Sequence, residues 1–247
     1  KKDDTEDNDD TEDKDDTEDK DDTEDNDEER ENIVRKSDMP QPLNTPKTRN
    51  AVRDLFFTDD FFDGLRKIAD DTDTPLIFDE IQTGFCSTGK VWYFQNLNII
   101  PDIVVFGKKT QLSGIMVNKK FSNIFKKPIR LEVTWDADLI DMVRCKFVIK
   151  ALIKNNILKN VKERSDQLKE GLLKIRGIKN LRNAGLLLAF DLENKNLRDK
   201  LVTSLFEKNM IVNPTKDNTI RLRPPLSVST LEIDEAINII KSSMDSF

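Results

Sequence analysis

The first 31 residues contain no apolar side chain, so no hydrophobic core can form from them. Residues 3–26 are four copies of a six-residue unit, DDTEDN or DDTEDK. This unit matches neither the helical nor the strand period, and its like charges repel one another. We therefore expect residues 1–31 to be a disordered acidic tail. Such a tail would either bind cations or a basic partner, or be a repeat expansion without a selected role.

A globular fold is possible only in the rest of the chain. The tail holds 20 acidic and 5 basic residues, so its removal changes the formal net charge from −7 to +8. Hydrophobic content then rises from 36% to roughly two-fifths, as in ordinary globular proteins. Residues 32–50 carry Pro40, Pro42 and Pro46 among polar residues, which indicates a linker, and ordered structure should begin near Ala51.

Several functional classes are excluded by composition. The sequence has no histidine, which rules out a Ser-His-Asp triad, a His-based zinc site and haem ligation by histidine. Its two cysteines, Cys86 and Cys145, cannot build a disulfide framework or a four-thiolate site, so we expect buried, reduced thiols and no metal site. With no apolar run of about 18 residues and no recognisable targeting segment, a cytoplasmic chain without membrane contact is expected.

The N-terminal part of the foldable region alternates between helix and strand. Thr58 can cap a helix whose first turn holds Asp59 and Asp60, and apolar residues then recur at helical spacing up to Pro75. Residues 76–78 and 103–106 are short, wholly apolar runs typical of buried strands. Two such strands joined by a crossover predict an α/β fold with a parallel sheet covered on both faces.

The C-terminal part is predicted to be a smaller α+β unit that follows a long helix. Apolar residues from Leu139 to Ile153 indicate that helix, and residues 157–176 a second one. The pattern then predicts a strand over 186–192, a helix over 196–208, and short strands over 210–212 and 220–222. Ser229 and Glu232 form a capping box that opens a final helix.

Charged side chains follow both apolar strands directly. Asp79 and Glu80, with Gln82 nearby, end the first strand, and Lys108 and Lys109 end the second. Ligands of open parallel sheets bind at this carboxyl edge. A lysine opposite a carboxylate, without histidine, suits an imine with pyridoxal 5'-phosphate (PLP), whose ring nitrogen a carboxylate keeps protonated. A solvated strand end is the simpler interpretation of either group alone.

The letters around these groups resemble a known family. Residues 76–109, LIFDEIQTGFCSTGKVWYFQNLNIIPDIVVFGKK, are similar to the signature of class III PLP-dependent aminotransferases: a DExQTGxGxTG block, then PD, then the cofactor lysine. The separation of 29 positions from Asp79 to Lys108 matches the family spacing. FGKKTQ, VTWDADLIDMVR and TIRLRPPLSVSTLEIDEAI most resemble the L-lysine ε-aminotransferase branch, and the similarity runs from about Asp54 to the C-terminus.

The resemblance implies a fold and a domain layout. Residues 51–143 would be the C-terminal part of a PLP-binding large domain of fold type I, and residues 144–247 an interdomain helix with the small α+β domain. The family chain is roughly twice as long as this ordered region, and its first half has no counterpart here. That half normally supplies a loop for the cofactor phosphate, an aromatic residue on the ring and much of the dimer surface.

The resemblance also implies site residues. Lys108 would form the imine (Schiff base) and shuttle a proton, Asp79 would pair with the pyridinium nitrogen, and Gln82 would approach the phenolic oxygen. The remaining roles would be ring packing for Ile81, phosphate binding across a dimer interface for Thr134, and binding of a substrate carboxylate for Arg221, with Arg223 as the second choice. The implied reaction moves an amino group from L-lysine, or a similar ω-amine, to 2-oxoglutarate in a homodimer.

Other residues depart from the family pattern. Cys86 stands where glycine is usual, and the Gly-Gly-Asn expected after Thr134 is Asp136-Ala137-Asp138, whose carboxylates would repel a phosphate. These departures leave a second hypothesis open: a catalytically inactive, truncated remnant that acts, if at all, as an interaction protein. Nucleic-acid binding through the lysine pairs between residues 108 and 127 is the weakest hypothesis, because the acidic tail would compete for that surface; we expect no nucleic-acid partner.

Overall fold

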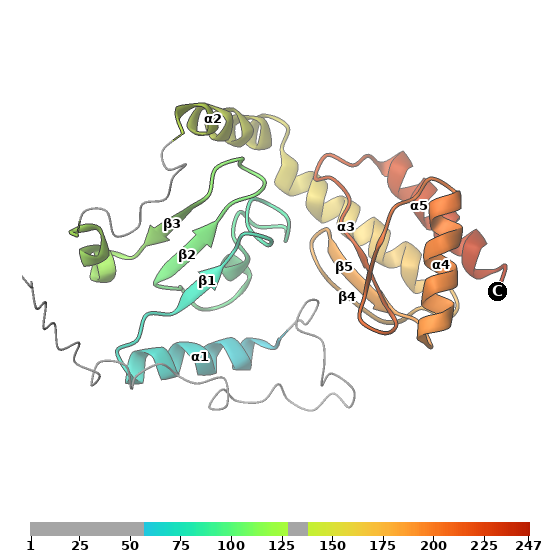
Figure 1. Ribbon diagram of the computed structural model, residues 1–247, viewed down its shortest axis with the longest axis horizontal. Helices are drawn as coiled ribbons and strands as arrows, with labels where there is room; N and C mark the ends of the chain where they lie inside the picture. The colour runs from blue at the N-terminus through green and yellow to red at the C-terminus, as the bar shows by residue number, and fades with distance from the viewer. Residues whose placement is uncertain (1–56, 128–137) are drawn as a thin grey trace, which may run out of the picture. The chain divides into compact units, whose positions relative to one another are not determined.

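The computed structural model describes residues 57–127 and 138–247 (Figure 1). The acidic tail, the linker, the start at Ala51 and Thr134 lie outside the described residues. The predictions made for them therefore stay predictions. In the described residues two sheets form, one of three strands and one of four.

The first helix, α1, runs from Asp59 to Asp71, as the apolar spacing predicted. Thr58 occupies the N-cap position, but its side chain makes no capping hydrogen bond, so that part of the prediction is wrong. The helix is tied to the following sheet by Arg66, whose guanidinium lies 2.7 Å from the Asp102 carboxylate. Burial alone would raise the pKa of Asp102, but the Leu76 N–H and Arg66 outweigh burial and lower it.

The first sheet has the order β1-β2-β3. Strands β1 (Ile77–Asp79) and β2 (Ile103–Phe106) are parallel, which confirms the predicted pairing. Strand β3 (Gly114–Val117) was not predicted and runs antiparallel to β2, so the described sheet is mixed. Because β1 forms the edge of this sheet, Ile77 is 53% exposed, and the expectation of a fully buried strand is wrong there. One 3-10 helix, Tyr93–Asn96, lies between β1 and β2, and another, Lys119–Phe125, follows β3.

Two long helices come next, as predicted: α2 (Leu139–Lys154) and α3 (Ile157–Leu173). The second sheet has the order β4-β5-β7-β6, with all neighbours antiparallel. Its strands are β4 (Lys179–Ala184), β5 (Leu187–Asp191), β6 (Asn213–Thr215) and β7 (Thr219–Leu222), and its helices are α4 (Lys195–Glu207) and α5 (Thr230–Met244).

Local sequence signals in this part agree with the structure in three places out of four. The capping box of α5 is confirmed, since the Ser229 and Glu232 side chains each accept from the other's backbone N–H. The strands predicted over 186–192 and 220–222 exist. The strand predicted over 210–212 is wrong: the Met210 N–H donates to Leu205 O in the turn that closes α4. The strand forms instead at β6, whose edge position tolerates the missing N–H of Pro214.

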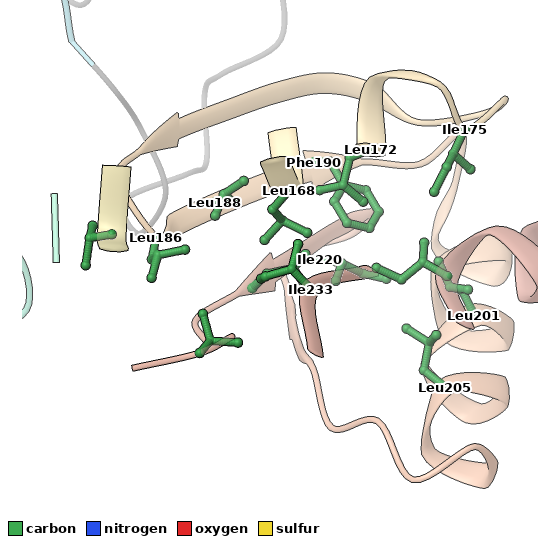
Figure 2. Packing of buried hydrophobic residues seen from close by; sticks show 14 of the residues in the cluster. Leu168, Leu172, Ile175, Leu186, Leu188, Phe190, Leu201, Leu205, Ile220 and Ile233 are labelled. Atoms are coloured by element: carbon green, nitrogen blue, oxygen red, sulfur yellow. The ribbon is translucent and has the colours of Figure 1, made fainter. Parts of the chain in front are cut away.

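The hydrophobic core lies on one face of the second sheet (Figure 2). Leu188 and Phe190 of β5 pair with Leu222 and Ile220 of β7, so these four side chains share a face. Leucines and isoleucines of α3, α4 and α5 pack against that face, among them Leu168, Leu172, Leu201, Leu205, Ile233 and Ile240. Cys86, from the loop after β1, belongs to the same cluster.

The helices offer no candidate for a membrane span. In residues 57–127 and 138–247, none is both long enough and apolar enough to cross a bilayer.

Candidate active site

The site begins where β1 and β2 end. Asp79 is in register with Val105 of the parallel neighbour, and the Glu80 N–H donates to Val105 O at 2.8 Å. The chain therefore leaves both strands at the same edge of the sheet, with Asp79 at one strand end and Lys108 just beyond the other. Both side chains are exposed at this edge. The predicted carboxylate and lysine thus share one edge of the sheet.

Lys108 and Gln82 are joined directly. The Lys108 Nζ donates to the Gln82 Oε1 at 2.8 Å, and the Lys109 Nζ donates to the Gln82 backbone carbonyl at 2.7 Å. The two adjacent lysines therefore bind the two oxygens of one residue. Lys108 has a φ of +57°, in the left-handed region that non-glycine residues seldom adopt. Backbone strain of this kind is concentrated at functional sites.

The loop that carries Gln82 is anchored by Glu80. Glu80 is only 1% exposed, and its carboxylate accepts the Tyr93 N–H at 2.9 Å, the Phe94 N–H at 3.0 Å and the Thr83 hydroxyl. A buried carboxylate is costly unless it is hydrogen-bonded, and these three donors meet that requirement. Glu80 therefore fixes the path of the chain on both sides of Gln82.

The same loop turns tightly against its surroundings. A Cβ on Gly84 would lie 2.8 Å from the Trp92 ring and 2.9 Å from Glu80 O, so only glycine fits there. Cys86, where the family has glycine, has a φ of +74° and accepts strain that glycine would avoid. The loop also meets the second sheet, because the Leu186 N–H donates to Ser87 O at 2.9 Å.

Both thiols are free and buried, as composition predicted. Burial raises the pKa of Cys86, and the nearby Lys109 ammonium offsets part of that rise. Cys86 is therefore protonated at neutral pH and packs as a small apolar side chain.

Lys109 has the most strongly shifted pKa at the site. Burial lowers the pKa of Lys109 to about 8, helped by the positive charges of Lys108 and Arg223 and opposed by Glu80 and Cys86. A lysine with this pKa exists partly as the neutral amine near pH 8. Because the positive charge of Arg223 helps to lower the pKa of Lys109, Arg223 lies in the neighbourhood of the lysine pair.

The remaining predicted residues lie as follows. Ile81 is partly buried next to Asp79, whose carboxylate accepts the Ile81 N–H at 3.0 Å. Arg221 lies in β7 between Ile220 and Leu222, and so on the sheet face opposite the core. Asp138, expected to repel a phosphate, caps α2 by accepting the Ile140 N–H at 2.7 Å. Neither Glu80 nor Lys109 was predicted to have a role in the cofactor site. The one feature of the sequence that could have pointed to them is that Glu80 directly follows Asp79 and Lys109 directly follows Lys108.

Comparison with known proteins agrees with this geometry. The family model for class III aminotransferases matches residues 54–244. The chain belongs to the class III aminotransferases. It is 37% identical over 200 residues to the L-lysine-epsilon aminotransferase of Mycobacterium tuberculosis strain H37Rv, a match that covers 77% of this chain and 44% of that protein. It is 31% identical over 198 residues to the 4-aminobutyrate aminotransferase of Dictyostelium discoideum, covering 77% of this chain and 40% of that protein.

Solved structures of this family share the fold. The lysine aminotransferase from M. tuberculosis in the internal aldimine form superposes with a TM-score of 0.72 at 35% identity, over 77% of this chain and 46% of that one. The chain thus spans less than half the length of these three relatives. Class III aminotransferases are PLP-dependent enzymes, so family membership implies that cofactor.

The described residues fit PLP in their chemistry. The cofactor needs an amine for its carbonyl, a carboxylate for its ring nitrogen and a polar partner for its phenolic oxygen. Lys108, Asp79 and Gln82 supply these three groups at one sheet edge, and both charged side chains are open to solvent. The phosphate ligand predicted at Thr134 lies outside the described residues.

Proposed function

We propose that this chain carries the lysine-bearing half of a PLP-dependent aminotransferase site. The amino donor would be L-lysine, through its ε-amine, or a similar ω-amine, and the acceptor 2-oxoglutarate, a reaction of lysine catabolism in the cytoplasm. The observation that carries the proposal is the contact of Lys108 Nζ with Gln82 Oε1 at 2.8 Å, at the edge where Asp79 also ends its strand. The named lysine-ε aminotransferase relatives support the choice of donor.

Lys108, Asp79 and Gln82 would each have a defined role in this site. The bound cofactor supplies an electron sink for the pair left when the substrate carbon loses a proton. Lys108 would act as the attachment point and then move that proton through its Nζ. Asp79 would hold the proton on the ring nitrogen, and Gln82, already bonded to Lys108, would orient that amine.

The substrate and cofactor need further contacts. Arg221 would bind a substrate carboxylate with its planar guanidinium, and Thr134 would bind the cofactor phosphate, across the interface of a homodimer. Arg223 is the alternative carboxylate ligand, and its influence on Lys109 favours a place close to the lysine pair.

A second candidate function is an inactive remnant. The chain spans only 44% of the M. tuberculosis relative, so more than half of that relative has no counterpart in the match. On this hypothesis the site geometry persists by descent, while the protein acts, if at all, through its surfaces.

Reductive trapping separates the two functions. The purified chain would be mixed with PLP, treated with borohydride and mapped by peptide mass spectrometry, and lysine-dependent amino transfer to 2-oxoglutarate would be measured in parallel. We expect the label at Lys108, its loss in Lys108→Ala, and no loss in the control Lys119→Ala, which lies on an exposed 3-10 helix. Label scattered over surface lysines, unchanged in Lys108→Ala, would contradict a cofactor site. Label at Lys108 without turnover would favour the remnant.

A further inference from the structure

Lys109 is a half-buried cation beside the candidate site, and the proposed reaction gives it no role. Its Nζ donates to the Gln82 backbone carbonyl at 2.7 Å, while the Nζ of Lys108 donates to the Gln82 side-chain Oε1 at 2.8 Å. A hydrogen bond from a charged donor is shorter and roughly twice as strong as one between neutral groups. Lys109 therefore binds, through a strong contact, the same residue that orients the Lys108 amine.

The turn that carries both lysines is fixed by its own contacts. The Gln111 N–H donates to Lys108 O at 3.0 Å. Thr110 is fully buried, and its hydroxyl donates to Leu112 O at 2.7 Å. The Lys109 side chain therefore extends from a fixed backbone after β2 and reaches the loop that follows β1.

The loop after β1 is anchored next to Gln82. Glu80 is buried and hydrogen-bonded through its carboxylate, and its backbone carbonyl accepts the Gly84 N–H at 2.8 Å. The peptide group that follows Gln82 lies between these two residues, and its carbonyl is the one that Lys109 binds. Because a peptide group is rigid, the direction of this carbonyl constrains the backbone from which the Gln82 side chain extends.

We propose that Lys109 is a positioning residue, whose ammonium holds the Gln82 backbone so that the Gln82 side-chain oxygen stays on the Lys108 amine. The inference rests on the proposed function, because the position of this amine matters for catalysis only if Lys108 attaches the cofactor. Attachment at Lys109 itself is disfavoured by geometry. Its Nζ is directed at a backbone carbonyl from a half-buried side chain, whereas Lys108 is exposed.

A double-mutant cycle tests the inference. Lys109→Met removes the ammonium, and Gln82→Ala removes the side chain through which the ammonium would act. Methionine keeps the apolar stem and removes a charge that burial disfavours, so this variant should stay folded. The full chain would be treated with PLP and cyanoborohydride at pH 7, below the pKa of about 8 to which burial lowers Lys109, and the rate of labelling at Lys108 followed by peptide mass spectrometry.

Lys109→Met should slow the labelling of Lys108 by about tenfold, because the amine is no longer oriented. In the Gln82→Ala background the same substitution should slow it at least about fivefold less. The loss of a positive charge beside Lys108 acts equally in both backgrounds and cancels in this comparison.

Two further variants control the cycle. Lys109→Arg keeps a charged donor and should label Lys108 within about threefold of the parent rate. Lys119→Met removes an exposed lysine of the 3-10 helix Lys119–Phe125 and should change the rate by less than about twofold.

A reagent that needs no cofactor separates this inference from the proposed function. Formaldehyde with cyanoborohydride methylates exposed amines, and a Lys108 released from its hydrogen bond should react faster. The factor by which Lys109→Met accelerates this methylation should be about threefold higher with Gln82 present than in the Gln82→Ala background. If PLP labels no specific lysine but this difference is found, the proposed function fails and the positioning role stands.

Two outcomes would overturn the inference. One is an equal effect of Lys109→Met in both backgrounds and with both reagents, because Lys109 would then act through its charge or through the fold and not through Gln82. The other is a Lys109→Arg variant that labels Lys108 no faster than Lys109→Met does, because a charged donor at this position would then be without effect.

Discussion

At the scale of single residues, two identical neighbours differ because of what surrounds them. Lys108 is exposed and donates to the Gln82 side chain, whereas Lys109 is partly buried and donates to the Gln82 backbone. Their shared partner holds both ammonium groups close together. Burial and that repulsion act on Lys109, which is why its pKa falls.

Lys109 makes stability depend on pH in a definite direction. Its pKa is about 8 in the folded protein against 10.5 ordinarily, so between these values the unfolded chain binds more protons. Stability therefore rises with pH across that window, and Lys109→Met should abolish the rise. The difference in unfolding free energy between the parent and Lys109→Met should grow by roughly 1–2 kcal/mol from about pH 7.5 to 9.5, allowing for partial exposure. Urea titrations at each pH measure it.

The control for this titration is Lys119→Met, an exposed lysine on the 3-10 helix Lys119–Phe125. Its difference from the parent protein should stay flat with pH. If the Lys109→Met difference is equally flat, Lys109 is an ordinary solvated lysine.

Glu80 is the second residue whose role comes from its surroundings. Glu80→Gln keeps the shape, but an –NH₂ group replaces one of the two carboxylate oxygens and so faces either the Phe94 N–H or the Tyr93 N–H and the Thr83 hydroxyl. We expect a loss of about 2–4 kcal/mol in the free energy of unfolding, because buried polar groups lose their partners. The exposed Glu235→Gln should change it by less than about 0.5 kcal/mol. Equal effects in the two variants, by urea unfolding at pH 7, would remove Glu80 as the anchor of the loop.

At the scale of elements, backbone turns decide where the two sheets meet. Gly185 joins β4 to β5 with a φ of +55°, and a Cβ there would overlap Ser87 O and lie 2.7 Å from the Thr88 Cα. Both groups belong to the loop that also carries Gln82. The turn and the loop therefore need a glycine between them, both for its conformation and for its lack of a side chain.

Two glycine substitutions test this account with opposite signs. Gly185→Ala should cost about 2 kcal/mol or more, since it adds strain and a clash with backbone atoms. Gly64→Ala lies within α1 with nothing near the new Cβ, so it should stabilise by about 0.5–1 kcal/mol through helix propensity. Thermal unfolding measures both. A neutral Gly185→Ala would mean that the loop and turn separate easily in solution.

At the scale of the whole molecule, charge is divided unevenly along the chain. Residues 1–31 carry a formal net charge of −15, and the remainder carries +8. The first segment has no apolar side chain to bury, whereas the rest contains the whole core cluster. We therefore expect residues 1–31 to set the sign of the net charge, and the rest of the chain to set the stability of the fold.

Removal of residues 1–31 should reverse the charge but keep the fold. The shortened chain should bind a cation exchanger near pH 7, which the full chain does not. Its free energy of unfolding at about 0.15 M salt should stay within about 0.5 kcal/mol, because residues 1–31 have no apolar side chain to bury. A destabilisation beyond about 1 kcal/mol in urea unfolding would show that the acidic segment contributes to the fold.

Local patterns in the sequence were enough to predict the helices and the two parallel strands. Helical spacing and the Ser229 capping box depend on residues within one or two turns, so α1, α2, α3 and α5 could be located beforehand. The motif around Asp79 and Lys108 likewise indicated the family and its cofactor. The three strands β3, β4 and β6 escaped prediction, because sheet edges need a partner strand more than an apolar pattern of their own.

The tertiary structure alone decided how the site is held together. Glu80 looks like a strand-end acid in the sequence, and its burial depends on N–H groups 13 and 14 residues away. The pKa of Lys109 is lowered first by its burial in the fold and then by positive charges, one of them on Arg223, which is distant in the chain. Composition and spacing select the chemical groups, but desolvation and pairing are properties of three-dimensional neighbours, and those neighbours exist only once the chain has folded.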